Sequence, residues 1–417
     1  MEQVFSPLDE KLELQPGSLT PKQLSHLTQF ASVVSFGQAT KLLKQHHGVE
    51  VSISTSRRQT EAIGASAETV QNEQAGDIEK QKDAVCYSSG KKVISSDGAY
   101  IALRGKIYTE VKTATLGEVK ENSKRSNQRP EQEVKMTNIT YFSRVVDSQT
   151  FTELAAGEIA RRGFFHAEKV AAVSDGAEWI QNFVAAHRLD AVRILDFYHA
   201  SQYLRDIATI VRDAGTILPG SWLDDQLHEL KHNGPNKVLE EIGRLLQDHS
   251  NLDELKQKFH YLQKRQKMMQ YPIFQKNGWP IGSGSAESAN THVVQSRMCG
   301  AGMYWDPRYV NPMLALRTSE CNDRWNEMRH QAFHHRLQVR LSKRIDRQKR
   351  RYEELKQNVK ESIIRFMFLY CLYKPKVSEN TISPPQLELV SPSTSDTKNA
   401  CRPAQSHPWR RYHLAKK

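Results

Sequence analysis

Cysteine is scarce and scattered in this chain of 417 residues. The five cysteines are Cys86, Cys299, Cys321, Cys371 and Cys401, and no two of them form a C-x-x-C pair. A disulfide framework and a structural zinc site of thiolates are therefore both disfavoured, and we expect a protein of a reducing compartment.

Long apolar runs and an excess of acidic residues are also lacking. No stretch approaches the roughly 20 apolar residues that a membrane-spanning helix needs, and the N-terminal sequence MEQVFSPLDEKLELQ is not that of a signal peptide. There are 59 Lys+Arg against 47 Asp+Glu, a net charge of +12. We therefore expect a cytoplasmic protein with no membrane partner and with an anionic partner, nucleic acid first.

The first part of the chain has a helical pattern. Apolar residues recur at helical spacing over residues 20–65, with a capping box at 35–38 and a helix stop at Gly48. A short turn then leads to a polar and basic helix. This order is typical of a helix-turn-helix, and it fits a plain three-helix bundle equally well. The candidate DNA-reading residues on that last helix are Arg57, Arg58 and Gln59.

The middle of the chain changes to a strand pattern. The expected strands are 92–98, 106–112, 138–143, 169–173 and 192–195, with helices at 150–162 and 177–187 and an exposed loop at 118–135. Three strands followed by alternating helices and strands predict an α/β layer with a mixed sheet. Residues 216–270 are polar and predict a group of helices.

Three acids stand where a site could form. Asp97 and Asp175 each end an apolar strand and precede a glycine, which would place both at strand ends where open α/β sheets bind ligands, although Asp-Gly alone is also a turn signal. Glu287 begins a helix after a Gly-Ser-Gly-Ser loop, and taken by itself it is better explained by a favourable helix dipole than by a metal site. Three converging carboxylates need cations between them, and two Mg²⁺ ions could clamp the oxygens of a phosphoryl displacement.

Four sequence strings carry a resemblance to a known family. They are, in order, SSDGAYIAL, VAAVSDGAEWI, ILDFYHASQYL and IGSGSAESANTHVVQSRMCGAGMYW. Together they resemble a DDE transposase of a bacterial insertion sequence, of the ISKra type and related to the Mutator group, from about residue 20 to Trp325. The resemblance implies an RNase H-like catalytic core with a helical insertion, and two Mg²⁺ or Mn²⁺ ions per site.

The resemblance also implies roles for individual residues. It makes Asp97, Asp175 and Glu287 the catalytic, metal-binding acids. Asp196 and His199 match a supporting D-x-x-H signature, and a helix-start His199 bonded to Asp196 is compatible with that role. The resemblance also matches Arg297 and Trp305, which we expect to bind DNA, with Arg297 in contact with a phosphate. The chain departs from the family at Asn290, where relatives often carry a cysteine followed by lysine, and this would weaken local DNA contacts.

A basic stretch follows the region of resemblance. Residues 336–351 hold eight Lys+Arg against one acid, and phosphate contact is favoured over a merely solvated helix face. The candidates are Arg336, Arg340, Lys343, Arg344 and Arg347.

The expected function is DNA transposition. The chain would bind double-stranded DNA at terminal inverted repeats and at the target, act as a homodimer in the DNA complex, and work at the bacterial nucleoid. A catalytically inactive DNA-binding protein derived from a transposase and a metal-dependent nuclease without strand transfer are the alternatives. The expected division is 1–66 helix-turn-helix, 67–88 linker, 89–212 and 279–330 core, 213–278 helical insertion, 331–374 basic helical extension and 375–417 disordered basic tail.

Overall fold

A computed structural model gives the structure of the chain. It describes residues 12, 14–15, 17–81, 88–119, 134, 136–249 and 251–373, without the side chains of 78–81, 88–89 and 285–287. The predicted tail 375–417 and most of the predicted loop 118–135 lie outside the described residues. The chain divides into two units, Met1–Asp346 and Arg347–Lys417.

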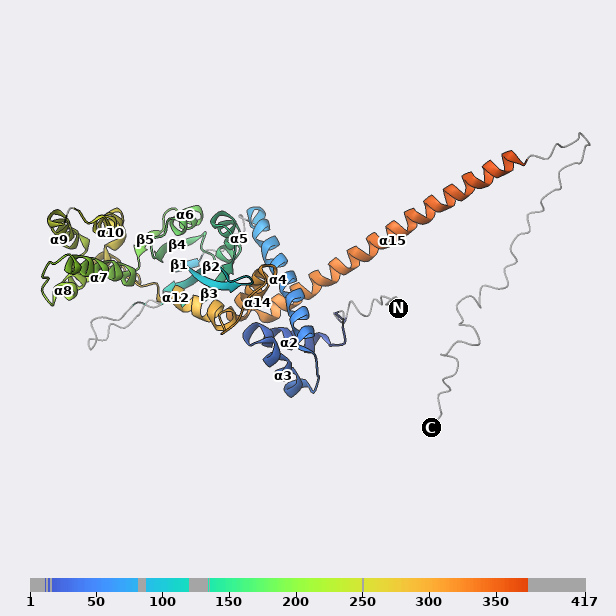
Figure 1. Cartoon of the computed structure of the whole chain (residues 1–417), viewed down its shortest axis with the longest axis horizontal. Coiled ribbons are helices and arrows are strands. Elements are labelled where there is room, and N and C mark those ends of the chain that lie inside the picture. The colour runs from blue at the N-terminus through green and yellow to red at the C-terminus, as the bar shows by residue number, and fades with distance from the viewer. Residues whose placement is uncertain are drawn as a thin grey trace, which may run out of the picture. The chain divides into compact units, whose positions relative to one another are not determined.

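Helices make up most of the described chain (Figure 1). They are α2 (Pro21–Val33), α3 (Phe36–His47), α4 (Ile53–Gln81), α5 (Ser148–Arg161), α6 (Glu178–His187), α7 (Phe197–Asp213), α8 (Trp222–His232), α9 (Pro235–Asp248), α10 (Asp253–Lys264), α11 (Tyr271–Lys276), α12 (Gly284–Ala289), α13 (Ser296–Met298), α14 (Val310–Cys321) and α15 (Trp325–Leu372), with 3-10 turns η1 (Gln266–Met269) and η3 (Pro307–Tyr309) and the π-helical turn η2 (Asn290–Gln295). None of the described helices combines the length and the apolar composition needed to cross a membrane.

The sheet is mixed, which confirms the predicted α/β class. Its strands are β1 (Ser88–Leu103), β2 (Ile107–Val119), β3 (Met136–Arg144), β4 (Ala167–Ser174) and β5 (Val192–Leu195), in the order β3-β2-β1-β4-β5. Strands β1, β4 and β5 run parallel, and β2 is antiparallel to both of its neighbours.

Strand β1 is longer than predicted. We expected it to end at the Asp97-Gly98 turn signal, but it continues to Leu103 and pairs with β2 from Lys92 onward. Gly98 takes part in this ladder opposite Lys112, in a place where a Cβ atom would collide with the Glu110 carboxylate. The long antiparallel pairing overrides the local turn signal of Asp-Gly.

Helices cover both faces of the sheet. Successive side chains of a strand point to opposite faces, so neighbouring residues of β1 pack in different cores. Ile94 of β1 packs with helices α5 and α6 on one face. Val93, one residue earlier, points to the other face and belongs to the core that continues past β5 into helices α7 to α11. Farther along β1, Ile101 packs on this second face against η2, α13 and α14.

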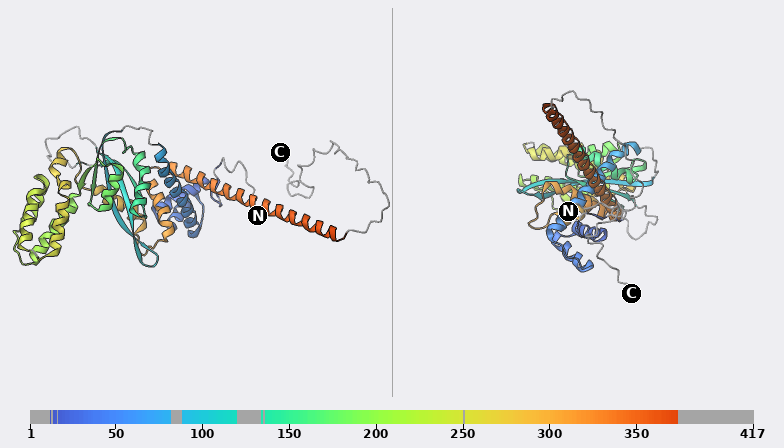
Figure 2. Two further views of the ribbon diagram at one scale, coloured as in Figure 1. Left: turned by 90° about the horizontal axis from the view of Figure 1, so that it is seen from above. Right: turned by 90° about the vertical axis from the view of Figure 1, so that its right-hand side faces the viewer.

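The range predicted as a helical insertion, 213–278, contains helices α8 to α11. With α7 they gather beyond the β5 edge of the sheet, as both Figure 1 and Figure 2 show. Their apolar side chains form one core with β4 and β5, so the group of helices is anchored to the strands that carry Asp175 and Asp196.

The N-terminal helices pack on the end of the core rather than apart from it. Ser35 caps α3 with the predicted capping box, and Gly48 ends the helix with a φ of 65°. Helix α4 then runs to Gln81 without a break, so most of the predicted linker 67–88 is helix. Ile63 and Ala67 of α4 are buried against α14 and the start of α15, which supplies the stabilisation that the polar sequence lacks.

Candidate active site

Three aspartates lie where the parallel pairing of three neighbouring strands ends. The pairing of β1 with β4 reaches Ser95 and Val173, and that of β4 with β5 reaches Ser174 and Leu195. Continued by one or two residues, this register sets Asp97 beside Asp175 and Asp175 beside Asp196. Sequence reasoning placed Asp97 at a strand end; it lies instead within β1, at the point where the parallel pairing ends.

The Asp97 carboxylate has two hydrogen-bond donors. The backbone N–H of Gly98 donates to Oδ1 at 2.8 Å, and the Asn290 side-chain amide donates to Oδ2 at 2.9 Å. Burial raises the pKa of Asp97, and the charge of Asp175 raises it further, against the lowering influence of Gly98, His199 and Asn290. The strand register sets Asp97 and Asp175 side by side, so their two carboxylates repel each other.

Residues at the C-terminal end of α10 hold the turn that follows β4. Tyr261 of α10 donates its hydroxyl to the carbonyl of Asp175, and Arg265 donates from Nε and Nη2 to the carbonyl of Gly176 at 3.2 and 2.7 Å. The Arg265 guanidinium also lies 3.6 Å from the centre of the Tyr261 ring, and that ring stacks on Tyr203 at 4.0 Å.

Only glycine fits at the second position of this turn. Gly176 has a φ of +81°, and a Cβ atom there would lie 2.5 Å from Nε of Arg265. Asp175 itself accepts the N–H of Ala177 at 2.8 Å, so both the backbone and the carboxylate of the turn are fixed.

Asp196 is a buried connector at the end of β5. It caps helix α7 by accepting the N–H of Tyr198 at 2.9 Å, and its other oxygen accepts the hydroxyl of Ser283. The backbone N–H of Phe197 donates to the carbonyl of Ile281 at 2.9 Å, so the glycine-rich loop is tied to the start of α7. His199 is half-buried in the first turn of α7 and lies near enough for its charge to lower the pKa of Asp97.

The third predicted acid lies on the helix that follows this loop. Glu287 belongs to α12, and its side chain is outside the described residues. Asn290 stands three residues later, at the start of the π-helical turn, and its bond to Asp97 ties this helical segment to β1. A π-turn within a helix frequently marks a functional position.

The chemistry of the described groups fits a hard cation. Carboxylate and amide oxygens are the ligands that Mg²⁺ prefers, and the buried Oδ1 of Asn290 has no hydrogen-bond partner among the described side chains, which leave out 285–287. No set of three His, Cys, Asp or Glu side chains gathers as a metal site among the described side chains, which leave out Glu287.

Two residues that we placed at the DNA are packing residues instead. Arg297 is 3% exposed, donates to the carbonyl of Ala31 at 2.8 Å and lies between the rings of Phe36 and Trp305. Burial lowers its pKa to about 10. Trp305 is 7% exposed and donates its indole N–H to the carbonyl of Met298 at 3.0 Å. Both join the helices around the sheet, which contradicts the predicted DNA contacts of Arg297 and Trp305.

The other predicted DNA-binding residues divide by exposure. Arg57 and Arg58 are exposed on α4, whereas Gln59 is buried and accepts a hydrogen bond from the half-buried Arg336 at 3.1 Å. A buried Gln59 does not reach a DNA base in this structure. Of the five candidates named in the basic stretch, Arg340, Lys343, Arg344 and Arg347 are exposed.

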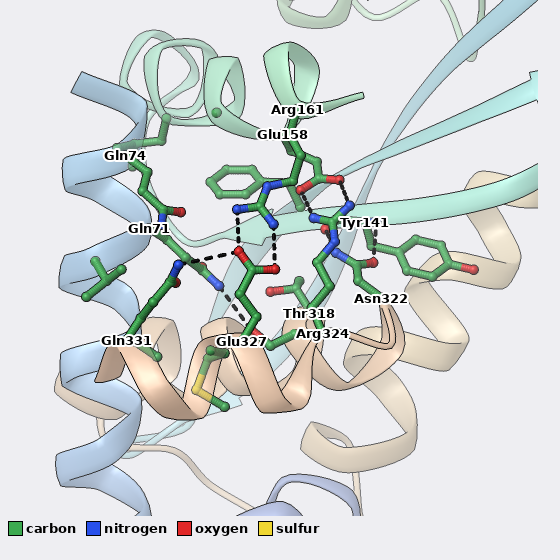
Figure 3. Close-up of a pocket in the computed structure, with 17 residues that line it drawn as sticks. Gln71, Gln74, Tyr141, Glu158, Arg161, Thr318, Asn322, Arg324, Glu327 and Gln331 are labelled. Atoms are coloured by element: carbon green, nitrogen blue, oxygen red, sulfur yellow. Dashed lines mark hydrogen bonds and ion pairs between the residues drawn. The ribbon is translucent and has the colours of Figure 1, made fainter. Parts of the chain in front are cut away.

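A pocket between α4, α5, α14 and α15 lies away from the acids (Figure 3). Two bidentate ion pairs occupy it: Arg161 with Glu327 at 2.7 and 2.8 Å, and Arg324 with Glu158 at 2.6 and 2.9 Å. These four charged side chains are paired with one another, so they connect the helices and are not left to bind a ligand.

Sequence reasoning missed Tyr261, Arg265 and Ser283, and treated Asn290 only as a departure from the family. The one available signal was the position of Asn290, about one helical turn after Glu287. Comparison of the chain with protein-family models and with curated proteins finds no match.

Proposed function

We propose that the chain is a DDE-type DNA transposase with an RNase H-like core. The observation that carries the proposal is the pair Asp97 and Asp175 on neighbouring parallel strands, with the segment that bears Glu287 tied to Asp97 through Asn290. A mixed sheet whose acids lie where the parallel pairing ends supports it, since open sheets bind ligands there.

Asp97, Asp175 and Glu287 would hold Mg²⁺ or Mn²⁺, two ions per site, and these ions neutralise charge and activate water for in-line phosphoryl displacement when bound. The chain's own groups fix the acids in place. Asn290 and Gly98 hold the Asp97 carboxylate, and Tyr261 and Arg265 hold the turn of Asp175. Such prior positioning matters because an error of about 1 Å in a reacting geometry can cost about 100-fold in rate.

The proposed reaction has two balanced steps. Water attacks a phosphodiester at the end of the element, the bond to the 3′ oxygen breaks, and that oxygen leaves as a 3′-hydroxyl. The 3′-hydroxyl then attacks a phosphodiester of target DNA. Its oxygen forms the new bond to phosphorus, the bond from that phosphorus to the target's own 3′ oxygen breaks, and that oxygen takes up a proton and leaves as a 3′-hydroxyl, so the element is joined to its target.

The proposed partner is double-stranded DNA at terminal inverted repeats and at the target, within the bacterial nucleoid. The exposed Arg57 and Arg58 on α4 support a helix-turn-helix reader, and the exposed Arg340, Lys343 and Arg344 support contact with phosphates. Binding two ends of one element requires two copies of the chain in the DNA complex.

A joining assay tests the proposal. Duplexes made from the inverted repeats that flank the coding sequence are incubated with the full chain, Mg²⁺ and a supercoiled target plasmid. We expect both cleaved ends and joined products. Cleavage without joining would identify a nuclease, and specific binding without cleavage would identify a DNA-binding protein derived from a transposase; either outcome would overturn the proposal.

A further inference from the structure

The second unit carries a regular row of exposed apolar side chains. Every described residue of the unit, 347–373, is exposed. Apolar residues recur every seven residues at 352, 359, 366 and 373, and two more stand three residues further on, at 355 and 369. This is the spacing of the a and d positions of a coiled coil. The row consists of Tyr352, Leu355, Val359, Phe366, Leu369 and Tyr373, with exposed fractions from 52% to 86%.

A single helix with such a row is not a stable arrangement in water by itself. In proteins, most of the stability of a helix comes from the packing of its apolar face against other elements. A contiguous apolar surface that is exposed marks an interaction site. The heptad spacing specifies the shape of the partner: another helix with a matching row, because each knob must enter a hole between four facing residues.

We propose that this stretch of α15 pairs with the same stretch of a second copy of the chain, in the antiparallel direction. The inference is independent of the proposed catalysis, since the row lies wholly in the second unit and involves neither the acids nor DNA.

Charge decides the direction. The positions that flank the row carry several cations, and in a parallel pair Arg351 of each copy would face Lys356 of the other. Like charges at these flanking positions are the usual device by which a helix pair is disfavoured. A parallel pair of this sequence therefore contains two repulsive contacts.

An antiparallel pair avoids them. When Leu355 of one copy lies opposite Phe366 of the other, each flanking cation meets an uncharged side chain, along which its aliphatic stem can lie. The facing pairs are then Lys349 with Tyr370, Arg351 with Leu372, and Lys356 with Ile363. The first of these also allows a cation–π contact.

The test begins with the mass of the full-length chain in solution, measured by light scattering without DNA or metal. We expect a dimer. Val359→Lys places a charge in the row and should weaken the dimer on the order of 100-fold. Ile364→Lys is the matched control, because Ile364 and Val359 are both 57% exposed but Ile364 lies off the row; this variant should remain dimeric.

Crosslinking then tests the direction, in a background with all five native cysteines replaced by serine. Leu355→Cys combined with Phe366→Cys should give a disulfide between copies that joins 355 to 366, whereas Leu355→Cys alone should give none. A disulfide from Leu355→Cys alone would show a parallel pair and overturn the inference. A monomeric wild type would overturn the inference as well, and so would equal dissociation of the two lysine variants. A monomer that sediments with anionic lipid vesicles would show that the row binds lipid instead.

Discussion

The bond between Asn290 and Asp97 gives a prediction that separates a functional role from a structural one. Asn290 is 4% exposed, and its amide is one of the two groups that donate to the Asp97 carboxylate. Asn290→Leu removes the donor and keeps a side chain of similar size, so the site loses a hydrogen bond without gaining a large cavity.

The size of the effect follows from the geometry. An amide that donates to a carboxylate at 2.9 Å makes a charge-assisted bond, and such bonds contribute about 1.5–3 kcal/mol. Groups that orient a metal ligand typically contribute about 10–100-fold to metal affinity. We therefore expect Asn290→Leu to weaken Mn²⁺ binding by about 10–100-fold.

The assay is a Mn²⁺ titration of the full chain, followed by the electron paramagnetic resonance signal of free Mn²⁺. Asn322→Leu is the control, because Asn322 bonds both the N–H and the carbonyl of Tyr141, at 2.8 and 3.0 Å, away from the acids. This control should lower the free energy of unfolding and leave Mn²⁺ affinity unchanged. Wild-type affinity in Asn290→Leu, or an equal loss in both variants, would refute the reasoning.

Three further predictions concern the surroundings of the site and the fold. Tyr261→Phe, which loses only the hydroxyl on the Asp175 turn, should lower the DNA cleavage rate about tenfold at saturating DNA while costing only about 1 kcal/mol of unfolding free energy; an unchanged rate would contradict the positioning role. Arg324→Met should lower the free energy of unfolding in urea by about 3 kcal/mol, because it leaves the Glu158 carboxylate, whose side chain is 9% exposed, without its ion-pair partner. Arg161→Met at the more exposed pair should lower it by at most about 1 kcal/mol. Equal losses in the two variants would contradict the burial argument. Burial lowers the pKa of His187 to about 4, below its unfolded value of about 6.5, so the unfolded chain binds the extra proton and stability should fall by about 2 kcal/mol from pH 7 to pH 5; a His187→Gln variant with the same pH dependence would count against this.

Local signals were enough to predict much of the fold. The capping box of α3, the helix stop at Gly48 and the short apolar strands β4 and β5 each depend on neighbouring residues, and the structure contains them. The mixed sheet followed from the order of strands and helices.

Features that depend on distant residues were predicted wrongly. Strand β1 passes through the Asp-Gly turn signal because β2 pairs with it from Lys92 to Leu103. The polar stretch that follows residue 66 was left open as a linker or an exposed helix. Helix α4 continues through it because Ala67 and Ala75 pack on other elements, a contact that its composition does not reveal.

The candidate site shows the same division. Asp97 and Asp175 were found from their strings, and the register of the strands brings them together. Tyr261 and Arg265 were missed because two residues one turn apart on a polar helix carry no sign of the distant turn that they hold. Arg297 was misplaced because a conspicuous arginine in a family string does not reveal whether it is buried.

The most direct test of the proposed transposase is Mg²⁺-dependent cleavage of terminal-repeat duplexes by single-acid variants of the full chain. We predict that Asp97→Asn, Asp175→Asn and Glu287→Gln each abolish cleavage while the chain still binds the duplex. Asp224→Asn is the control, an exposed acid in the first turn of α8, and should cleave like the wild type. Wild-type cleavage by all three variants would contradict the assignment of the site.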